Sequence, residues 1–314
     1  MRTARTIADG VGYYHVILKA TGPQFLFRED ADKAAFQDIL GRVSRFSSVQ
    51  PLAYAFLDNH MHLLLKVPER RSVPDDDFAR RVAALYGPDR ADALFARWEK
   101  WREEGRDAEA ERERDGLLRR MFDLGQFMKT VKELFHIRYC RAHGWEGTLW
   151  RGRYKSLLVC ESFAAFKALS LYIALNPVRA GIAKRGTDSK WTSYGQARRG
   201  GGFGAECHGA LLRELARLAG SAKGGGAALA ERFGKWMAEA EAVPAETVKE
   251  ALSRGERLSL PQMLACRVLA FGNGRALGLM RQVAPLARRG GPRPVGQCGL
   301  FTATRVRGPY RLIA

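Results

Sequence analysis

The hydrophobic and polar positions at the start of the chain predict a strand followed by a helix. Tyr13–Lys19 is a run of β-branched and aromatic residues that ends shortly before a turn at Gly22-Pro23, which is typical of a strand. Between Glu29 and Phe46 the apolar residues recur at helical spacing. This pattern predicts an amphipathic helix, for which Asp30 is the expected N-cap.

Two apolar runs of strand length follow this helix. Leu52–Leu57 and Met61–Val67 are separated by Asp58-Asn59, a polar pair that tolerates tight turns. The pattern therefore predicts a β-α-β-β arrangement for this part of the chain.

The next segment changes in character and predicts helices. Residues 73–113 mix acidic and basic side chains with recurrent Leu, Phe and Trp, which indicates a helical insertion with solvated faces. Leu117–His143 carries the apolar stripe of one longer helix. Its opposite face carries Lys129, Lys132 and Arg138.

A strand and a helix are predicted next, before a break in the pattern. The strand is expected over Tyr154–Val159 and the helix over Ser162–Leu175, ending near Pro177 because proline cannot donate to the helical ladder. Arg198–Gly204 (RRGGGFG) is the best candidate linker, and a second Gly-rich stretch lies at Gly224–Gly226.

The C-terminal part predicts mostly helix and then a tail. Helical patterns extend from His208 to about Leu286, whereas the tail from Arg288 is rich in Arg, Gly and Pro and is assigned no structure. Ser259–Ala270 and Arg275–Val283 could be two helices of a helix-turn-helix. A small helical bundle is the open alternative.

The net charge of the chain indicates the kind of partner that it binds. Among 314 residues, 52 are Lys or Arg and 33 are Asp or Glu, which gives a net charge of +19 and favours nucleic acid as the partner. Binding to a membrane surface would need an amphipathic basic anchor or a long apolar span, and the sequence offers neither. The length suggests two or three modules.

Cysteines and the N-terminus indicate the compartment. The 5 cysteines are scattered and never spaced as CxxC, which argues against a disulfide framework and against a cysteine zinc site. The N-terminus has no apolar core followed by a cleavage site, so secretion is not expected. We therefore expect a cytoplasmic or nucleoid-associated protein with reduced thiols.

The predicted third strand carries two histidines. His60 and His62 flank Met61, and the two-residue period of a strand points both imidazoles to one face. Two imidazole nitrogens could then bind one divalent ion. The alternative is a pair of surface or packed histidines without a metal.

The predicted last helix before Pro177 presents a phenol and an amide together. Tyr172 and Asn176 are four residues apart and therefore share a face. The alternative is a core tyrosine followed by an asparagine that ends the helix.

Between these segments, aromatic residues alternate with cations. In Gly147–Ser156 a base could stack on Trp150 or Tyr154 while Arg151, Arg153 and Lys155 contact phosphates. A tight turn that leads into a basic edge strand is the equally open alternative.

Taken together, these segments resemble the REP-associated tyrosine transposases, a branch of the single-tyrosine HUH transposases. The resemblance rests on four motifs in the same order and approximate separation: YHVILK (Tyr14–Lys19), LDNHMHLLLKVPE (Leu57–Glu69), GTLWRGRYKSLLV (Gly147–Val159) and LYIALNPVRAGI (Leu171–Ile182). Residues 246–278 also resemble the C-terminal extension of longer relatives. The insertion at 73–113 is absent from smaller relatives.

The resemblance implies an α+β fold with a ferredoxin-like antiparallel sheet and flanking helices. It implies Tyr172 as the nucleophile and His60, His62 and Asn176 as ligands of Mg²⁺ or Mn²⁺. The expected domains are residues 1–197 (catalytic), 198–207 (linker), 208–287 (helical extension) and 288–314 (basic tail).

The resemblance also implies a substrate, namely hairpin DNA with a single-stranded flank, cut through a 5′-phosphotyrosine and bound by a monomer or homodimer. The expected DNA-binding residues are Lys19, Lys129, Lys132, Trp150, Arg151, Arg153, Lys155 and Arg179. A DNA-binding protein of the same fold without strand transfer is the alternative. A zinc hydrolase is disfavoured, because a third ligand and a nearby general base are missing.

Overall fold

The strands that the structure describes lie in one sheet with the order β2-β3-β1-β4-β5-β7-β6. The structure is a computed structural model that describes residues 7–21, 27, 29–220, 226–256, 258–265, 276–278, 293–297 and 300–304. The strands are β1 (Gly12–Lys19), β2 (Gln50–Phe56), β3 (His60–Val67), β4 (Lys155–Val159), β5 (Ala276–Gly278), β6 (Arg293–Gln297) and β7 (Leu300–Thr304).

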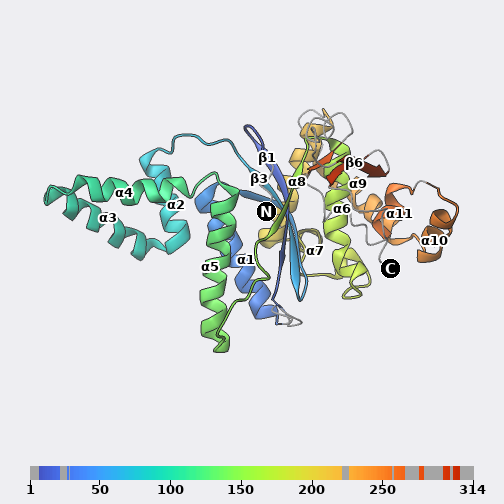
Figure 1. Cartoon of the computed structure of the whole chain (residues 1–314), viewed down its shortest axis with the longest axis horizontal. Coiled ribbons are helices and arrows are strands. Elements are labelled where there is room, and N and C mark those ends of the chain that lie inside the picture. Colours follow the sequence, from blue (N-terminus) through green and yellow to red (C-terminus); the bar gives the residue numbers. More distant parts are fainter. Residues whose placement is uncertain are drawn as a thin grey trace. The chain divides into compact units, whose positions relative to one another are not determined.

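Helices lie in the longer connections between the strands (Figure 1). They are α1 (Asp30–Ser47), α2 (Asp75–Tyr86), α3 (Pro88–Glu103), α4 (Asp107–Arg119), α5 (Leu124–His143), α6 (Phe163–Arg179), α7 (Ser193–Arg198), α8 (Gly202–Leu218), α9 (Gly226–Glu241), α10 (Ala245–Ser253) and α11 (Leu260–Ala265). A short 3₁₀ turn, η1 (Gly186–Asp188), precedes α7. The fold is α+β, as the sequence predicts.

The first four strands have the ferredoxin-like order β4-β1-β3-β2. β1 pairs with β4 in antiparallel register, with Tyr14 opposite Leu158. β2 and β3 form the predicted hairpin, whose turn is closed by the Leu57 N–H donating to the His60 carbonyl at 2.9 Å. This order makes β1 and β3 neighbours although a helix and a strand separate them in sequence, so side chains from both strands can meet.

Contacts divide the chain into two compact units that are not linear in sequence. One unit contains Met1–Phe27, Pro51–Leu65 and Trp150–Ala314, and the other contains Arg28–Gln50 and Lys66–Leu149. The predicted insertion therefore falls in the same unit as α1 and α5, which pack against one another.

In the first unit, α6 is the central core helix. Its residues are apolar on nearly every side, and Phe166, Leu169 and Ile173 are fully buried in a cluster with Leu52 and Leu64 of the sheet. The helix begins as predicted, with the Ser162 hydroxyl accepting from the Ala165 N–H at 3.1 Å.

The helix ends near Pro177, as predicted, but it runs through the proline to Arg179 and not only to Leu175. Proline removes the N–H donor of its own position, but the residues after it can still donate. The ladder resumes directly after it, with the Ala180 N–H donating to the Asn176 carbonyl at 2.9 Å.

Two other helix boundaries also differ from the prediction. The single helix predicted over Leu117–His143 is broken, because Phe122 adopts a left-handed conformation with φ 57°. The helix α5 then begins with Asp123 as its N-cap, and the Asp123 carboxylate accepts from the Gln126 N–H at 2.7 Å. The N-cap of α1 is Glu29, whose side chain makes no capping hydrogen bond. The predicted cap Asp30 lies in the first turn instead, where its negative charge interacts favourably with the helix dipole.

The C-terminal part differs most from the sequence prediction. α8 begins at Gly202, inside the segment predicted as a linker. β5 lies where the sequence predicts the second helix of a helix-turn-helix, and β6 and β7 form a hairpin in the tail that is assigned no structure from the sequence. Strand pairing explains why β5 forms where a helix is predicted, because β5 is bonded to β4 and β7. Residues 224–225, 266–275 and 279–292 of these predictions lie outside the described residues.

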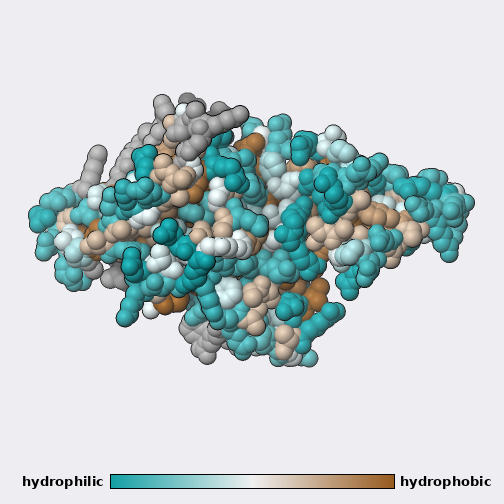
Figure 2. Space-filling view, turned by 180° about the vertical axis from the view of Figure 1, so that it is seen from behind, coloured by the Kyte–Doolittle hydropathy of each residue, from teal (hydrophilic) through white to brown (hydrophobic). Residues whose placement is uncertain are grey.

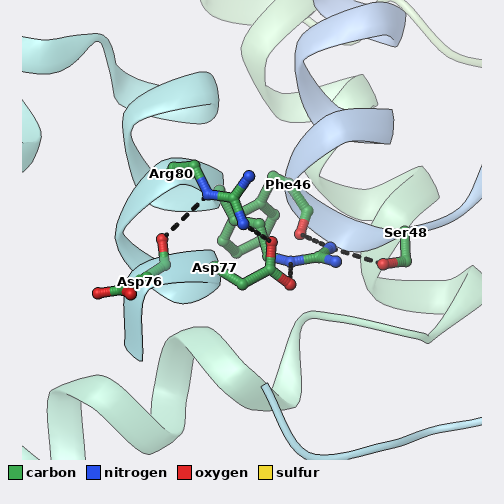
Figure 3. A network of polar contacts seen from close by, with 6 residues as sticks. Phe46, Ser48, Asp76, Asp77 and Arg80 are labelled. Atoms are coloured by element: carbon green, nitrogen blue, oxygen red, sulfur yellow. Dashed lines mark hydrogen bonds and ion pairs between the residues drawn. The ribbon is translucent and has the colours of Figure 1, made fainter. Parts of the chain in front are cut away.

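In the second unit, a polar network ties α2 to the end of α1 (Figure 3). Arg81 donates from Nε to the Asp77 carboxylate at 2.8 Å and from Nη1 to the Ser48 hydroxyl at 2.5 Å and the Phe46 carbonyl at 3.3 Å. Arg80 donates to the Asp76 carbonyl at 3.3 Å. The start of the insertion is thus anchored by charge-assisted bonds.

The surface is largely hydrophilic on the face shown in Figure 2. Among the described residues, the large exposed apolar side chains are Ile7, Val11, Ile137 and Ile182, which are separate in sequence. Within the same residues, no helix has the length and apolarity that a bilayer crossing requires.

Candidate active site

Two histidines of β3 lie next to one another at the start of the strand. The ring centroids of His60 and His62 are 5.1 Å apart. His62 is buried, with 3% of its surface exposed, and His60 is half-buried. Met61, between them, is fully buried and anchors this part of β3 in the core.

Tyr172 comes to the same place from α6. Its ring centroid lies 5.5 Å from that of His62, with the two planes nearly perpendicular at 85°. The tyrosine is 7% exposed, because α6 is covered on most sides. Strand and helix thus bring a phenol to the histidine pair across 110 residues of sequence.

Asn176 lies one helical turn after the tyrosine. Its Nδ2 donates to the Tyr172 carbonyl at 2.9 Å, and the residue is 8% exposed. This bond fixes the amide against the helix, and Oδ1 is then the side-chain atom suited to accept a hydrogen bond or to coordinate a cation.

In both histidines of β3, Nδ1 makes a hydrogen-bond contact. His60 Nδ1 lies 2.6 Å from the Asn59 side-chain oxygen, which can only accept, so Nδ1 is the donor in this contact. His62 Nδ1 lies 2.9 Å from Nε2 of His15, a residue of β1 that is 1% exposed.

Burial and neighbouring charge keep the central histidine neutral. The pKa of His62 lies well below its ordinary value, first because burial disfavours the imidazolium and then because the neighbouring basic groups His15, His60, Arg179 and Lys19 disfavour a further positive charge there. A neutral imidazole retains a lone pair at pH 7 and can therefore serve as a metal ligand.

Two predicted DNA-binding cations also belong to this neighbourhood. The guanidinium carbon of Arg179 lies 4.6 Å from the centroid of the Tyr172 ring, a cation–π contact within α6. Lys19 ends β1 with an exposed side chain, and its carbonyl accepts from the Arg151 N–H at 2.9 Å. The β1 end and the loop before β4 are therefore adjacent.

The aromatic residues of that loop are buried, whereas its cations are exposed. Trp150 is 7% exposed and its ring lies 6.1 Å from that of Phe27, and Tyr154 is 9% exposed. Arg151, Arg153 and Lys155 are exposed. The geometry matches a turn that leads into a strand, with aromatic groups for packing and cations on the outside.

The other predicted cations lie on α5, in the second unit. Lys129 is exposed and lies 3.9 Å from the Glu133 carboxylate, a weak surface ion pair. Lys132 is half-buried and Arg138 is exposed.

The sequence of the chain matches no family model and no curated protein. Its structure is similar to a solved one. That structure is a REP-associated tyrosine transposase bound to a REP hairpin, with 15% sequence identity and a TM-score of 0.41, and the match covers 64% of this chain and 87% of that one. The function of this chain is therefore inferred from its own geometry and motifs.

Sequence reasoning missed His15 as a neighbour of the histidine pair. The residue stands in the YHVILK motif, but its contact with His62 depends on the order of β1 and β3, which the sequence alone does not give. A histidine within an otherwise apolar strand is the signal that could have found it.

A second group of metal-capable side chains lies in the other unit, where Glu29, Asp32 and His143 approach within 4.8 Å of one another. His143 Nε2 lies 2.9 Å from the Asp32 carboxylate, which joins the last turn of α5 to the first turn of α1. The contact links one end of α5 to the start of α1, where the acidic side chain of Asp32 suits the dipole of α1.

Proposed function

We propose that this protein is a DNA nicking and rejoining enzyme that uses Tyr172 as a nucleophile. The observation that carries the proposal is the meeting of Tyr172 with His60 and His62, supported by Asn176 on the same helix. Side chains that serve only for packing would not need to bring a phenol, two imidazoles and an amide together. The four-motif resemblance in the sequence supports the same roles.

The donor set can hold a divalent cation, and the motif resemblance implies Mg²⁺ or Mn²⁺. His60 and His62 would each offer Nε2, and Asn176 would offer its amide oxygen, a mixed nitrogen and oxygen set. When bound, such an ion supplies charge neutralisation at the scissile phosphate. This donor set includes no thiolate, which disfavours a structural zinc site.

Tyr172 makes and breaks the covalent bonds of the proposed reaction. The Tyr172 oxygen attacks the phosphorus and loses its proton, the bond from phosphorus to the 3′ oxygen breaks, and that oxygen gains a proton. A 5′-phosphotyrosine and a 3′-OH result. Because the phosphodiester energy stays in the phosphotyrosine bond, a 3′-OH can attack it and restore Tyr172 without a nucleotide cofactor.

Arg179 is suited to this step by its place over the tyrosine ring. A cation on the face of the ring lies close to the charge that develops as the phenol ionises, and the burial of Tyr172 strengthens that attraction. We therefore assign Arg179 two roles, which are to stabilise the charge that develops on the Tyr172 oxygen and to bind phosphate.

Single-stranded hairpin DNA is the proposed substrate. The net charge of +19 favours a polyanion, and the exposed side chains of Arg151, Arg153 and Lys155 follow directly on the strand end near Lys19. The hairpin and its single-stranded flank come from the motif resemblance.

A covalent-adduct assay tests the proposal. The full chain is incubated with an end-labelled single-stranded hairpin and Mg²⁺ or Mn²⁺, and a protein–DNA adduct that survives denaturation is expected. Tyr172→Phe should give no adduct, whereas Tyr139→Phe, which removes a phenol from α5, should react as the wild type does. Equal adduct yields from wild type and Tyr172→Phe, or a wild type that binds the hairpin without any adduct, would contradict it. The second result would favour a DNA-binding protein without strand transfer.

A further inference from the structure

Beside the proposed nucleophile and ligands, one more buried histidine contacts the candidate site. His15 lies on β1, and its Nε2 is 2.9 Å from Nδ1 of His62 on the neighbouring strand β3. The ring planes are inclined by only 17°, and the centroids are 5.2 Å apart. His15 also lies 6.0 Å from the Tyr172 ring, edge to face.

Burial makes this contact specific. His15 is 1% exposed and His62 is 3% exposed, so water does not compete for the nitrogen atoms that face each other. A buried hydrogen bond between two imidazoles needs one donor and one acceptor, because two N–H groups repel and two lone pairs leave both unsatisfied. The pair therefore has two arrangements that differ in the tautomer of His62.

Only one arrangement is compatible with a metal ligand. If Nδ1 of His62 donates to Nε2 of His15, then Nε2 of His62 carries a lone pair. If His15 donates instead, Nε2 of His62 carries a proton and cannot coordinate a cation. In known sites, the partner of the second ring nitrogen sets the tautomer and orientation of a ligating histidine.

We propose that His15 is a positioning residue that accepts the Nδ1 proton of His62 and so holds Nε2 of His62 in its ligand form. The proposal rests on the proposed function only in that it assigns His62 as a ligand. Asn59 serves His60 in the same way, since its oxygen accepts from Nδ1 of that ring at 2.6 Å. Each of the two histidines thus has its own acceptor, one from a turn and one from a neighbouring strand.

Metal affinity in the absence of DNA tests the proposal without any activity. Binding of Mn²⁺ to the full chain is followed by the electron paramagnetic resonance signal of free Mn²⁺. His15→Phe, which fills the space but accepts no hydrogen bond, should weaken Mn²⁺ binding by about 10–100-fold. His15→Gln, whose side-chain oxygen can take the place of Nε2, should restore most of the affinity.

A matched control comes from another buried histidine of the same unit. His208 on α8 is 6% exposed and contacts the rings of Tyr194 and Phe233. His208→Phe should bind Mn²⁺ as the wild type does. Equal Mn²⁺ affinity of His15→Phe and wild type would overturn the role of His15.

The tautomer itself can be read in the wild-type protein, which keeps the proposal testable if His15→Phe does not fold. Nitrogen-15 NMR of the histidine side chains should show a protonated Nδ1 and an unprotonated Nε2 at His62 in the metal-free chain. The reverse pattern would overturn the proposal. If instead wild type binds no Mn²⁺, or His62→Ala binds as well as wild type, the proposed metal site fails, which is a separate outcome.

Discussion

Trp150 opens the segment that leads into β4, and the burial of its indole bears on how the loop can contact DNA. The residue forms an antiparallel bridge with Ala20 and packs near Phe27, with only 7% of its surface exposed. A covered ring is not open to base stacking in this conformation, whereas the proposed DNA-binding cations that come after it are exposed.

The expected effect of changing Trp150 is therefore on stability. Trp150→Ala should lower the free energy of unfolding by about 3–5 kcal/mol, because a large buried side chain is removed and a cavity remains. Trp150→Phe should cost less and should leave hairpin affinity within about twofold. Urea melts and filter binding measure the two effects. A large loss of affinity in Trp150→Phe at unchanged stability would instead indicate base stacking.

His208 gives a second prediction, on pH dependence. Burial lowers the pKa of His208 to about 4, with a further contribution from the charge of Arg198. The unfolded chain takes up a proton near pH 6.5, and the folded chain resists it down to about pH 4. Between these values the unfolded state binds more protons, so stability is full above pH 6.5 and falls as the pH is lowered.

His208→Phe should remove this part of the pH dependence. The difference in stability between wild type and variant should change by up to about 3 kcal/mol from pH 7 to pH 4, in favour of the variant at low pH. Thermal melts at both pH values give the comparison. If the two proteins lose stability in parallel, His208 is not kept neutral in the fold.

At the scale of elements, the sequence predicts the helices and strands that depend on a local pattern of apolar residues. It fails to predict those that depend on contacts with distant segments. The patterns of Tyr13–Lys19 and Met61–Val67 are sufficient to predict β1 and β3, because nearly every residue of these two strands is buried and each sequence is a matching apolar run. The break at Phe122 escapes prediction, since the apolar stripe continues through it. β5 escapes prediction because its hydrogen-bond partners lie in β4 and β7.

The same distinction applies to the candidate site. His60 with His62, and Tyr172 with Asn176, can be paired from strand and helix periods alone. That the two pairs meet depends on the packing of α6 against the sheet, for which the sequence signal is the order of the motifs. His15 joins them through sheet order.

Arg81 supports an element-scale prediction about the anchoring of α2. Its side chain is 12% exposed and bonds to Asp77, Ser48 and the Phe46 carbonyl. Arg81→Met keeps the apolar stem but leaves these acceptors without their donor, which should cost about 1–3 kcal/mol of stability. Arg80→Met, an exposed neighbour, is the control and should change stability by less than about 0.5 kcal/mol. Equal losses in urea melts would show that the network does not anchor the helix.

At the scale of the whole molecule, charge is unevenly distributed. Residues 75–119, which contain α2 to α4, carry 13 acidic and 10 basic side chains, whereas the whole chain has a net charge of +19. A net negative element repels phosphate, so we expect α2 to α4 to make no contribution to DNA affinity.

The salt dependence of hairpin binding distinguishes the cations of the loop before β4 from the charged residues of α2 to α4. Arg151→Gln with Arg153→Gln should weaken hairpin binding and reduce the slope of log affinity against log salt by about 0.7–0.9 for each phosphate that is no longer neutralised. Glu99→Gln with Glu103→Gln, two exposed acids of α3, should leave the slope unchanged. A slope that responds to the α3 pair and not to the loop pair would place the DNA on the insertion.

The central claim is that His60 and His62 serve the chemistry of Tyr172 and not the binding of DNA. The most direct measurement follows adduct formation and hairpin binding in parallel for His60→Ala and His62→Ala, with excess Mn²⁺. Both variants should lose the covalent adduct and bind the hairpin within about threefold of wild type, because removing a ligand affects the metal and leaves the exposed cations in place. Adduct formation at the wild-type rate in either variant would contradict the account.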